Sequence, residues 1–145
     1  NDDQLTEAFS RVPSLTNFKG RWQILGRHPL ILTDSAHNPE GVREVWHQIS
    51  TYSFDRLHVV LGTVNDKDLD RILPLYPVDA RYYFARPDIP RGLAAKTLQQ
   101  QAACFQLKGE VHDSVTQALE AAQAAAETTD LIFVGGSTFT VAEVV

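Results

Sequence analysis

The sequence predicts an α/β protein with a Rossmann-like, three-layer sandwich: a mostly parallel sheet of about six strands, one of them antiparallel, with helices on both faces. Two observations lead to this prediction. Short apolar segments alternate along the chain with longer segments whose apolar residues recur every three or four positions, and the connections between them are short. Several of the short segments are apolar throughout, as strands buried on both faces usually are.

Composition sets the class of protein. At 145 residues, with 43% apolar and 21% charged residues, the chain is long enough to bury a core of its own. A net charge of −5 without a basic run argues against a nucleic-acid partner, and no apolar run reaches the roughly 20 residues that span a bilayer. We therefore expect neither a nucleic-acid nor a membrane partner.

One cysteine, Cys104, rules out an internal disulfide and fits a reducing, cytoplasmic location. Because Cys104 follows two alanines in a helical segment, we expect it to be a small buried core residue. The chain starts without the basic and apolar regions of a secretory signal, so we expect none there. It has no initiator methionine and no methionine elsewhere, so we expect it to be part of a longer protein.

The first part of the chain is expected to lie outside the sheet. Residues Asp2 to Val12 have apolar side chains at helical spacing, and Pro13 to Lys19 reads as an extended link. We therefore assign residues 1–19 to a linker or to the tail of a preceding domain, and residues 20–145 to one domain.

The domain is predicted to open with two antiparallel strands. Trp22 to Leu25 forms the first and Leu30 to Thr33 the second, followed by a helix from Asn38 to Tyr52. Asn is a preferred N-cap, and Pro39 suits the first helical position, where no backbone N–H is needed.

The remaining elements follow in alternation. We expect strands at 57–61, 81–85, 109–112 and 130–134, with the third of these a weak edge strand. We expect helices at 66–75, at 91–105 with Leu93, Ala94, Leu98 and Ala102 inward, at 114–127 with Asp113 or Ser114 as its cap, and from 138 onward.

Polar residues follow four of these strands and should meet at one sheet edge, where ligands bind in open α/β folds. They are Asp34 and His37, the segment Asp66-Lys67-Asp68, the loop Arg86 to Arg91, and the turn Gly135 to Thr138. The mixture of an acid, a His, a Lys and backbone N–H groups suits a small zwitterionic or phosphorylated ligand. Each piece also has a structural interpretation, as a helix cap or a solvated turn.

Several familiar sites are absent from the sequence. It has no phosphate-binding G-x-x-x-x-G-K-[ST], no G-x-G-x-x-G and no G-x-S-x-G. The five histidines show no spacing typical of a metal site, so no metal ligand is assigned. The residues alone therefore indicate half of a ligand site.

Four motifs in order resemble the C-terminal domain of the Mur ligase superfamily, and within it the folate branch of folylpolyglutamate and dihydrofolate synthases. They are Gly20-Arg21-Trp22-Gln23, Asp34-Ser35-Ala36-His37-Asn38-Pro39, Asp66-Lys67-Asp68 and Gly136-Ser137. The resemblance runs from Gly20 to the end of the chain. Its departures are small: Ser35 and Trp22 stand where other residues are common, and Gly92 replaces an alanine after Pro90-Arg91, to which we assign no role.

The resemblance implies an ATP-dependent amide ligase. ATP phosphorylates a carboxylate of folate or dihydropteroate, and the amine of L-glutamate attacks the acyl phosphate. It also implies an N-terminal ATPase domain, absent from this chain, that carries the P-loop and supplies most of the Mg²⁺ ligands. Residues 1–19 would be the tail of that domain. The isolated C-terminal domain is then expected to be inactive.

Individual roles follow from the same resemblance. Arg21 would bind ATP phosphates and Asp34 the ribose hydroxyls, whereas His37, Lys67 and Ser137 would lie near L-glutamate. No residue of this chain is assigned a chemical step. Two alternatives stay open: the C-terminal domain of a cell-wall Mur ligase, and a non-catalytic module that binds a nucleotide or a carboxylate.

Overall fold

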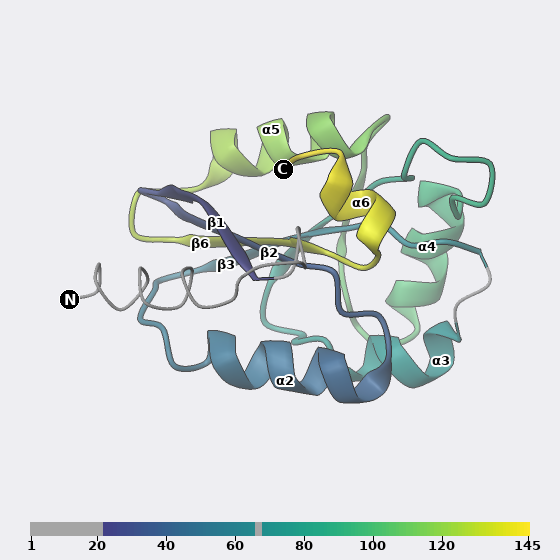
Figure 1. The fold of residues 1–145 in the computed structure, drawn as a ribbon, viewed down its shortest axis with the longest axis horizontal. Coiled ribbons are helices and arrows are strands. Elements are labelled where there is room, and N and C mark those ends of the chain that lie inside the picture. The colour runs from purple at the N-terminus through teal and green to yellow at the C-terminus, as the bar shows by residue number, and fades with distance from the viewer. Residues whose placement is uncertain (1–21, 66–67) are drawn as a thin grey trace.

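A computed structural model describes residues 22–65 and 68–145 and contains one six-stranded sheet between two layers of helices (Figure 1). The strands lie in the order β1-β2-β6-β3-β4-β5. Their bounds are β1 Gln23–Arg27, β2 Leu30–Asp34, β3 Leu57–Leu61, β4 Arg81–Phe84, β5 Gly109–Val111 and β6 Leu131–Gly135. Only β1 pairs antiparallel, with β2, and all other pairs are parallel. The predicted fold class is confirmed.

The centre of the sheet is made by the strands with the most apolar sequences. Every residue of β3 and of β6 is buried, and β6 lies between β2 and β3. The three-residue strand β5 forms an edge, as expected from its weak pattern. Burial on both faces explains why these central segments show no polar alternation.

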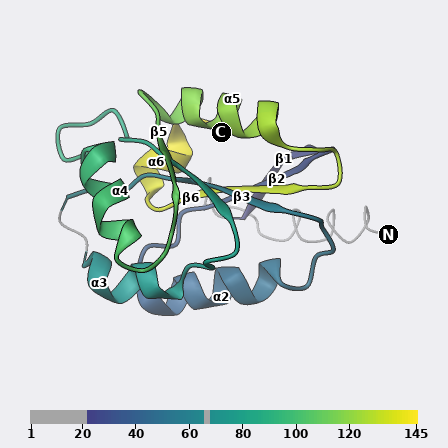
Figure 2. The ribbon, with the colours of Figure 1, turned by 180° about the vertical axis from the view of Figure 1, so that it is seen from behind.

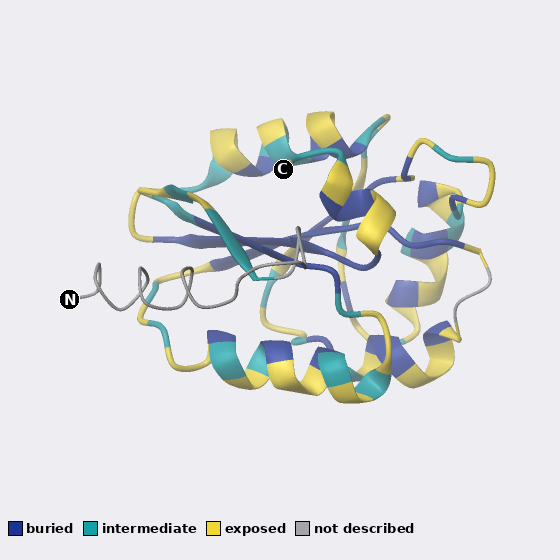
Figure 3. Cartoon of the chain, in the orientation of Figure 1, coloured by how far each residue is buried: buried dark blue, intermediate teal, exposed yellow. Residues whose placement is uncertain are grey.

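Helices cover both faces (Figures 1 and 2). They are α2 Pro39–Ile49, α3 Leu69–Ile72, the 3₁₀ turn η1 Leu73–Leu75, α4 Ala95–Ala103, α5 Val115–Ala125 and α6 Thr138–Ala142. Alternate strand residues point to opposite faces, so Val59 and Leu61 join the core under α2, α3 and α4, whereas Val60 joins the core under α5. Each large apolar side chain buried in this way contributes about 1.5–3 kcal/mol. Exposed residues lie along the outer helix faces and in the loops (Figure 3).

Two helices begin as the sequence predicts. The Asn38 side chain accepts a hydrogen bond from the Gly41 amide at 2.8 Å, ahead of Pro39. Ser114, rather than Asp113, caps α5 by accepting from the Gln117 amide at 3.0 Å. Both caps satisfy donors that have no partner inside the helix.

Helix α4 is shorter than predicted, because its expected first turn makes other contacts. The Leu93 amide donates to Thr63 O at 2.9 Å, and Gly92 forms an antiparallel bridge with Val64. The helix therefore starts at Ala95, which is buried in place of Ala94.

The prediction that Cys104 is buried is wrong. Cys104 is exposed at the C-cap of α4, two residues beyond Ala102, which lies on the inward face. Two positions correspond to about 200° around a helix, so Cys104 points to the opposite side.

One further predicted helix is shorter in the structure than expected, and the predicted N-terminal elements lie outside the described residues. The helix expected from Asp66 to Leu75 is observed as α3 followed by the 3₁₀ turn η1, which together span residues 69–75. The helix and link predicted within residues 1–19 fall outside the described residues. Every helix within 22–65 and 68–145 is too short or too polar to cross a membrane.

Candidate functional site

The carboxyl ends of the parallel strands meet at one edge of the sheet, as the sequence predicts. Asp34 pairs in register with Gly135, Gly135 with Leu61, and Leu61 with Phe84. The four polar loops therefore leave neighbouring positions of the sheet, and we call this row of strand ends the carboxyl edge. Helix α6 begins at the same edge (Figure 1).

Asp34 lies at the end of β2 with only 6% of its surface exposed. Its Oδ1 accepts a hydrogen bond from the Ala36 amide at 2.8 Å, so the turn that follows fixes the direction of the carboxylate. Burial, together with the nearby charge of Asp34, raises the pKa of Tyr76. Tyr76 thus remains a neutral apolar neighbour of this acid.

His37 is exposed in the same turn, with Nδ1 3.3 Å from Ser35 O, one position before the N-cap of α2. A solvent-facing imidazole at a helix N-terminus is accessible to a ligand at the carboxyl edge. The structure thus brings Asp34 and His37 into a single short turn.

Ser137 is buried, with 2% exposed, in the turn between β6 and α6. Its hydroxyl accepts from the Thr140 amide at 3.1 Å and lies 3.1 Å from Thr140 Oγ1. Thr140 Oγ1 donates in turn to Gly62 O at 2.8 Å. The hydroxyl of Ser137 therefore serves as the N-cap of α6.

The loop after β4 is bound to the loop after β3. The Asn65 amide donates to Arg91 O at 2.7 Å, next to the bridge between Val64 and Gly92. Arg86 holds its own loop closed, because Nε donates to Gly92 O at 2.9 Å and Nη2 to Ile89 O at 3.0 Å. The Arg86 guanidinium thus stabilises the loop, and its bonded groups are turned toward the backbone.

Two predicted site residues, Arg21 and Lys67, lie outside the described residues. Of the predicted site residues that are described, the structure places Asp34, His37 and Ser137 at the carboxyl edge. Within 22–65 and 68–145, no group of three or more His, Cys, Asp or Glu side chains could hold a metal ion. The described residues alone do not fit a Mg²⁺ site, so no chemical step is assigned to a metal here.

Sequence reasoning missed a buried polar cluster at the opposite, amino edge of the sheet. His58 donates from Nε2 to Asp130 Oδ2 at 3.0 Å, because a carboxylate can only accept, and His58 Nδ1 lies 2.9 Å from the Tyr83 hydroxyl. The signals were present: a His within the apolar strand LHVVL, and an Asp directly before LIFVG.

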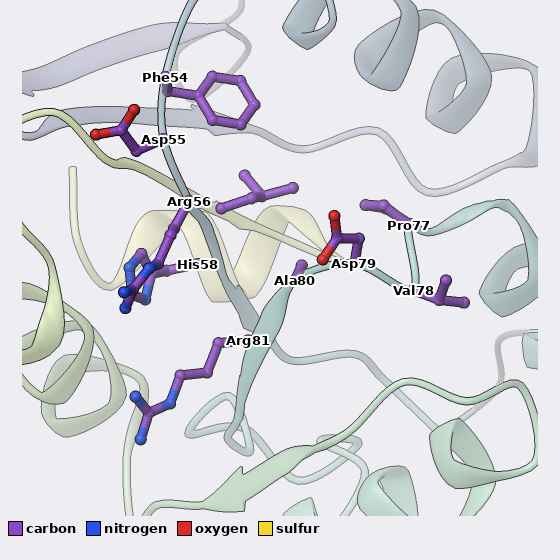
Figure 4. A pocket seen from close by; sticks show the side chains of 10 residues that line it. Phe54, Asp55, Arg56, His58, Pro77, Val78, Asp79, Ala80 and Arg81 are labelled. Atoms are coloured by element: carbon purple, nitrogen blue, oxygen red, sulfur yellow. The ribbon is translucent and has the colours of Figure 1, made fainter.

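Burial disfavours the charged form of Asp130, but hydrogen bonds from the Glu127 amide, His58 and the Arg56 amide lower its pKa overall. A pocket of about 520 Å³ lies beside this cluster, between the segments that lead into β3 and β4 (Figure 4). Being at the amino edge, this pocket is separate from the candidate site.

Comparison with known proteins agrees with the motifs at the carboxyl edge. Residues 20–138 match the family described as Mur ligase, glutamate ligase domain. The chain is 31% identical over 140 residues to a probable bifunctional folylpolyglutamate synthase/dihydropteroate synthase of Haloferax volcanii, covering 94% of this chain and 16% of that protein.

Solved structures show the same fold. E. coli FolC in complex with DHPP and ADP superimposes with a TM-score of 0.79 at 32% identity, covering 92% of this chain and 31% of that one. A bifunctional folylpolyglutamate synthase/dihydrofolate synthase with Mn, AMPPNP and L-glutamate bound gives a TM-score of 0.78 at 26% identity, covering 97% and 36%. The chain thus spans between about a sixth and a third of the length of these relatives.

Proposed function

This chain belongs to the Mur ligase family as its C-terminal, glutamate ligase domain, and we propose that the complete enzyme joins L-glutamate to folate or dihydropteroate in an ATP-dependent reaction. The observation that carries the proposal is the carboxyl edge, where Asp34, His37 and Ser137 follow neighbouring parallel strands at the positions of the family motifs. The relatives whose names include folylpolyglutamate synthase support the same choice.

The domain boundaries are part of this proposal. Residues 20–145 form the C-terminal domain, and residues 1–19 form the tail of the ATPase domain that precedes it. The family match beginning at residue 20 supports this division. The sequence given has no P-loop, so the ATPase domain supplies the phosphate-binding loop and most of the Mg²⁺ ligands.

Nucleotide binding is assigned to Arg21 and Asp34. The guanidinium of Arg21 would contact ATP phosphates through paired N–H donors, which match the geometry of phosphate oxygens. The carboxylate of Asp34 would accept hydrogen bonds from the ribose hydroxyls. Its fixed direction in the turn supports this role, because an acceptor that is already oriented loses little freedom when the ligand binds.

L-Glutamate binding is assigned to His37, Lys67 and Ser137. Lys67 supplies a point charge and Ser137 a hydroxyl for the carboxylates of the amino acid, while the exposed ring of His37 is open to the ligand from solvent. Domain closure would bring these groups to the acyl phosphate and exclude water, so that the amine of glutamate is the attacking group. A cytoplasmic location goes with this reaction.

A cell-wall Mur ligase is the nearest alternative, since it would use the same fold with another acceptor. Ser35 after Asp34 favours the folate branch, because cell-wall branches usually carry a tyrosine at that position. A non-catalytic binding module is the other alternative, and it requires a parent protein without an ATPase domain.

The test is ATP-dependent phosphate release by the full-length parent, with L-glutamate and one of three acceptors: dihydropteroate, tetrahydrofolate or a muramyl peptide precursor. We expect release with at least one pterin, and the two pterin rates distinguish a monofunctional from a bifunctional enzyme. Release only with the muramyl precursor would move the protein to the cell-wall branch. If a folded parent releases no phosphate with any of the three acceptors, the non-catalytic binding module is the interpretation that remains.

A further inference from the structure

Thr140 connects two loops of the carboxyl edge through its side chain. It is completely buried in α6, and its Oγ1 lies 3.1 Å from the Ser137 hydroxyl and 2.8 Å from Gly62 O. Ser137 belongs to the turn after β6, and Gly62 is the first residue after β3.

The two hydrogen bonds have a fixed direction. Gly62 O is a carbonyl and can only accept, so the Thr140 hydroxyl proton is directed to it. Thr140 Oγ1 then has lone pairs left to accept a proton from Ser137. Ser137 Oγ meanwhile accepts from the Thr140 amide at 3.1 Å. The order of donation is therefore Ser137 to Thr140 to Gly62 O.

The same contact requires two glycines. Gly136 has φ +112°, and a Cβ there would lie 2.1 Å from Gly62 O. A Cβ on Gly62 would lie 2.9 Å from Thr140 Oγ1. The two loops are therefore in direct contact where Thr140 bonds to Gly62 O.

We propose that Thr140 is a positioning residue for glutamate binding: through its hydrogen bond to Gly62 O it fixes the place of the Ser137 hydroxyl relative to the loop after β3. The inference rests on the proposed function, in which Ser137 contacts a carboxylate of L-glutamate. When that carboxylate is bound, Ser137 turns its proton from Thr140 Oγ1 to the ligand. The hydrogen bond from the Thr140 amide to Ser137 and the one from Thr140 Oγ1 to Gly62 O both remain, so only one contact is exchanged and the hydroxyl keeps its place.

The test compares Thr140→Ser with Thr140→Ala in the full-length parent, since these variants differ only in the hydroxyl. We expect Thr140→Ala to raise KM for L-glutamate about tenfold over Thr140→Ser, the effect of one hydrogen bond. KM for ATP and KM for the pterin should stay within about twofold of the values for Thr140→Ser, because the affected hydrogen bond is made to L-glutamate and not to either of these ligands. Thr140→Val is a second variant without the hydroxyl, which keeps the volume if Thr140→Ala proves unstable.

Thr33 provides a matched control. It is also completely buried, and its hydroxyl has no hydrogen-bond partner among the described residues. Thr33→Ser and Thr33→Ala should therefore give equal KM values for L-glutamate. A difference as large as that at Thr140 would show that any buried threonine hydroxyl matters, and would overturn the proposal.

Ser137→Ala separates this proposal from the proposed function. We expect Ser137→Ala to raise KM for L-glutamate, and Ser137→Ala/Thr140→Ala to be no worse than Ser137→Ala alone, because Thr140 acts through Ser137. If Ser137→Ala raises KM while Thr140→Ala and Thr140→Val do not, the role of Thr140 is wrong and the proposed function stands. If Ser137→Ala leaves KM unchanged, the assignment of Ser137, and Thr140 with it, is rejected.

Discussion

Asp34 combines burial with a carboxylate whose direction is set by the backbone. The Ala36 amide holds Oδ1 at 2.8 Å, and most of the side chain is shielded from water. A hydrogen bond formed by such an acid with a ligand is stronger than one formed in bulk water, since the local dielectric is low. This makes Asp34 the described residue whose replacement should be most informative.

We expect Asp34→Ala in the full-length parent to lower kcat/KM for ATP by about 10- to 100-fold, because a hydrogen bond to a charged group is lost. Steady-state kinetics at varied ATP measures this, with a melting curve to establish that the variant is folded. Asp55→Ala is the control: Asp55 bonds to Thr129 at the amino edge, so its loss should leave KM for ATP unchanged. Unchanged kinetics in folded Asp34→Ala would reject the nucleotide assignment.

Asp130 gives the domain a predictable dependence of stability on pH. Its pKa is lowered in the folded state, so its stabilising contribution is complete above the unfolded pKa of about 3.9 and is lost as the pH falls through the lower, folded value. Urea unfolding of the chain should therefore show a fall in the free energy of unfolding below about pH 4.

The matching variant is Asp130→Asn, which should cost about 1–3 kcal/mol at pH 7 and flatten the acid part of the curve. Asp79→Asn, at an exposed carboxylate, should change stability by less than about 0.5 kcal/mol. A wild-type pH profile in Asp130→Asn would mean that other carboxylates cause the acid sensitivity.

The loop before α4 depends on Gly92, whose position leaves no room for a side chain. A Cβ there would lie 2.3 Å from Pro87 O and 2.9 Å from Arg86 Cγ. We expect Gly92→Ala to lower the free energy of unfolding by about 1–3 kcal/mol, because the loop must open to admit the methyl group. Equilibrium urea unfolding of the chain measures the change.

Gly26→Ala is the control for Gly92→Ala. The nearest atom to its Cβ is the end of the flexible Ile31 side chain, at 3.1 Å. That neighbour can move, so the loss should be clearly smaller. Equal losses at the two glycines would show that the fit of the Gly92 loop is not what limits stability.

Elements whose pattern is local could be predicted from sequence. The apolar segment at β3, the Asn38-Pro39 start of α2 and the Ser114 cap of α5 each depend on neighbouring residues, and each was found where it was expected. The start of α4 could not be predicted, because the amide of Leu93 bonds to Thr63, thirty positions earlier. Helical spacing in the sequence gives no sign of such a contact.

Some features of the candidate site could likewise be predicted from the sequence, and others could not. That Asp34 and Gly135 end neighbouring strands follows from the α/β pattern and the rule for strand ends. The contact of Thr140 with Gly62 depends on β6 lying next to β3, and strand order is not encoded in any single segment. The cluster of His58 and Asp130 was missed for the same reason, since its members are 72 positions apart.

The described residues form a six-stranded sheet with a core on each face, and the sequence has no P-loop motif. We expect the isolated chain to unfold cooperatively in urea and to release no phosphate from ATP with glutamate and a pterin. Circular dichroism and a phosphate assay on the same preparation measure both properties. Phosphate release by the isolated chain would contradict the assignment of catalysis to closure between two domains.

The position of β6 also has a consequence for synthesis on the ribosome. β6 is the last strand in sequence, yet it lies between β2 and β3, and Leu131 pairs with Leu30 and with Leu57. Until β6 has been made, β1 with β2 and β3 with β4 and β5 lack the strand that joins them in the sheet. They join only when the final strand emerges and inserts between them. Such distant pairing slows folding, so the nascent domain exposes unpaired apolar strand edges until its last segment is translated.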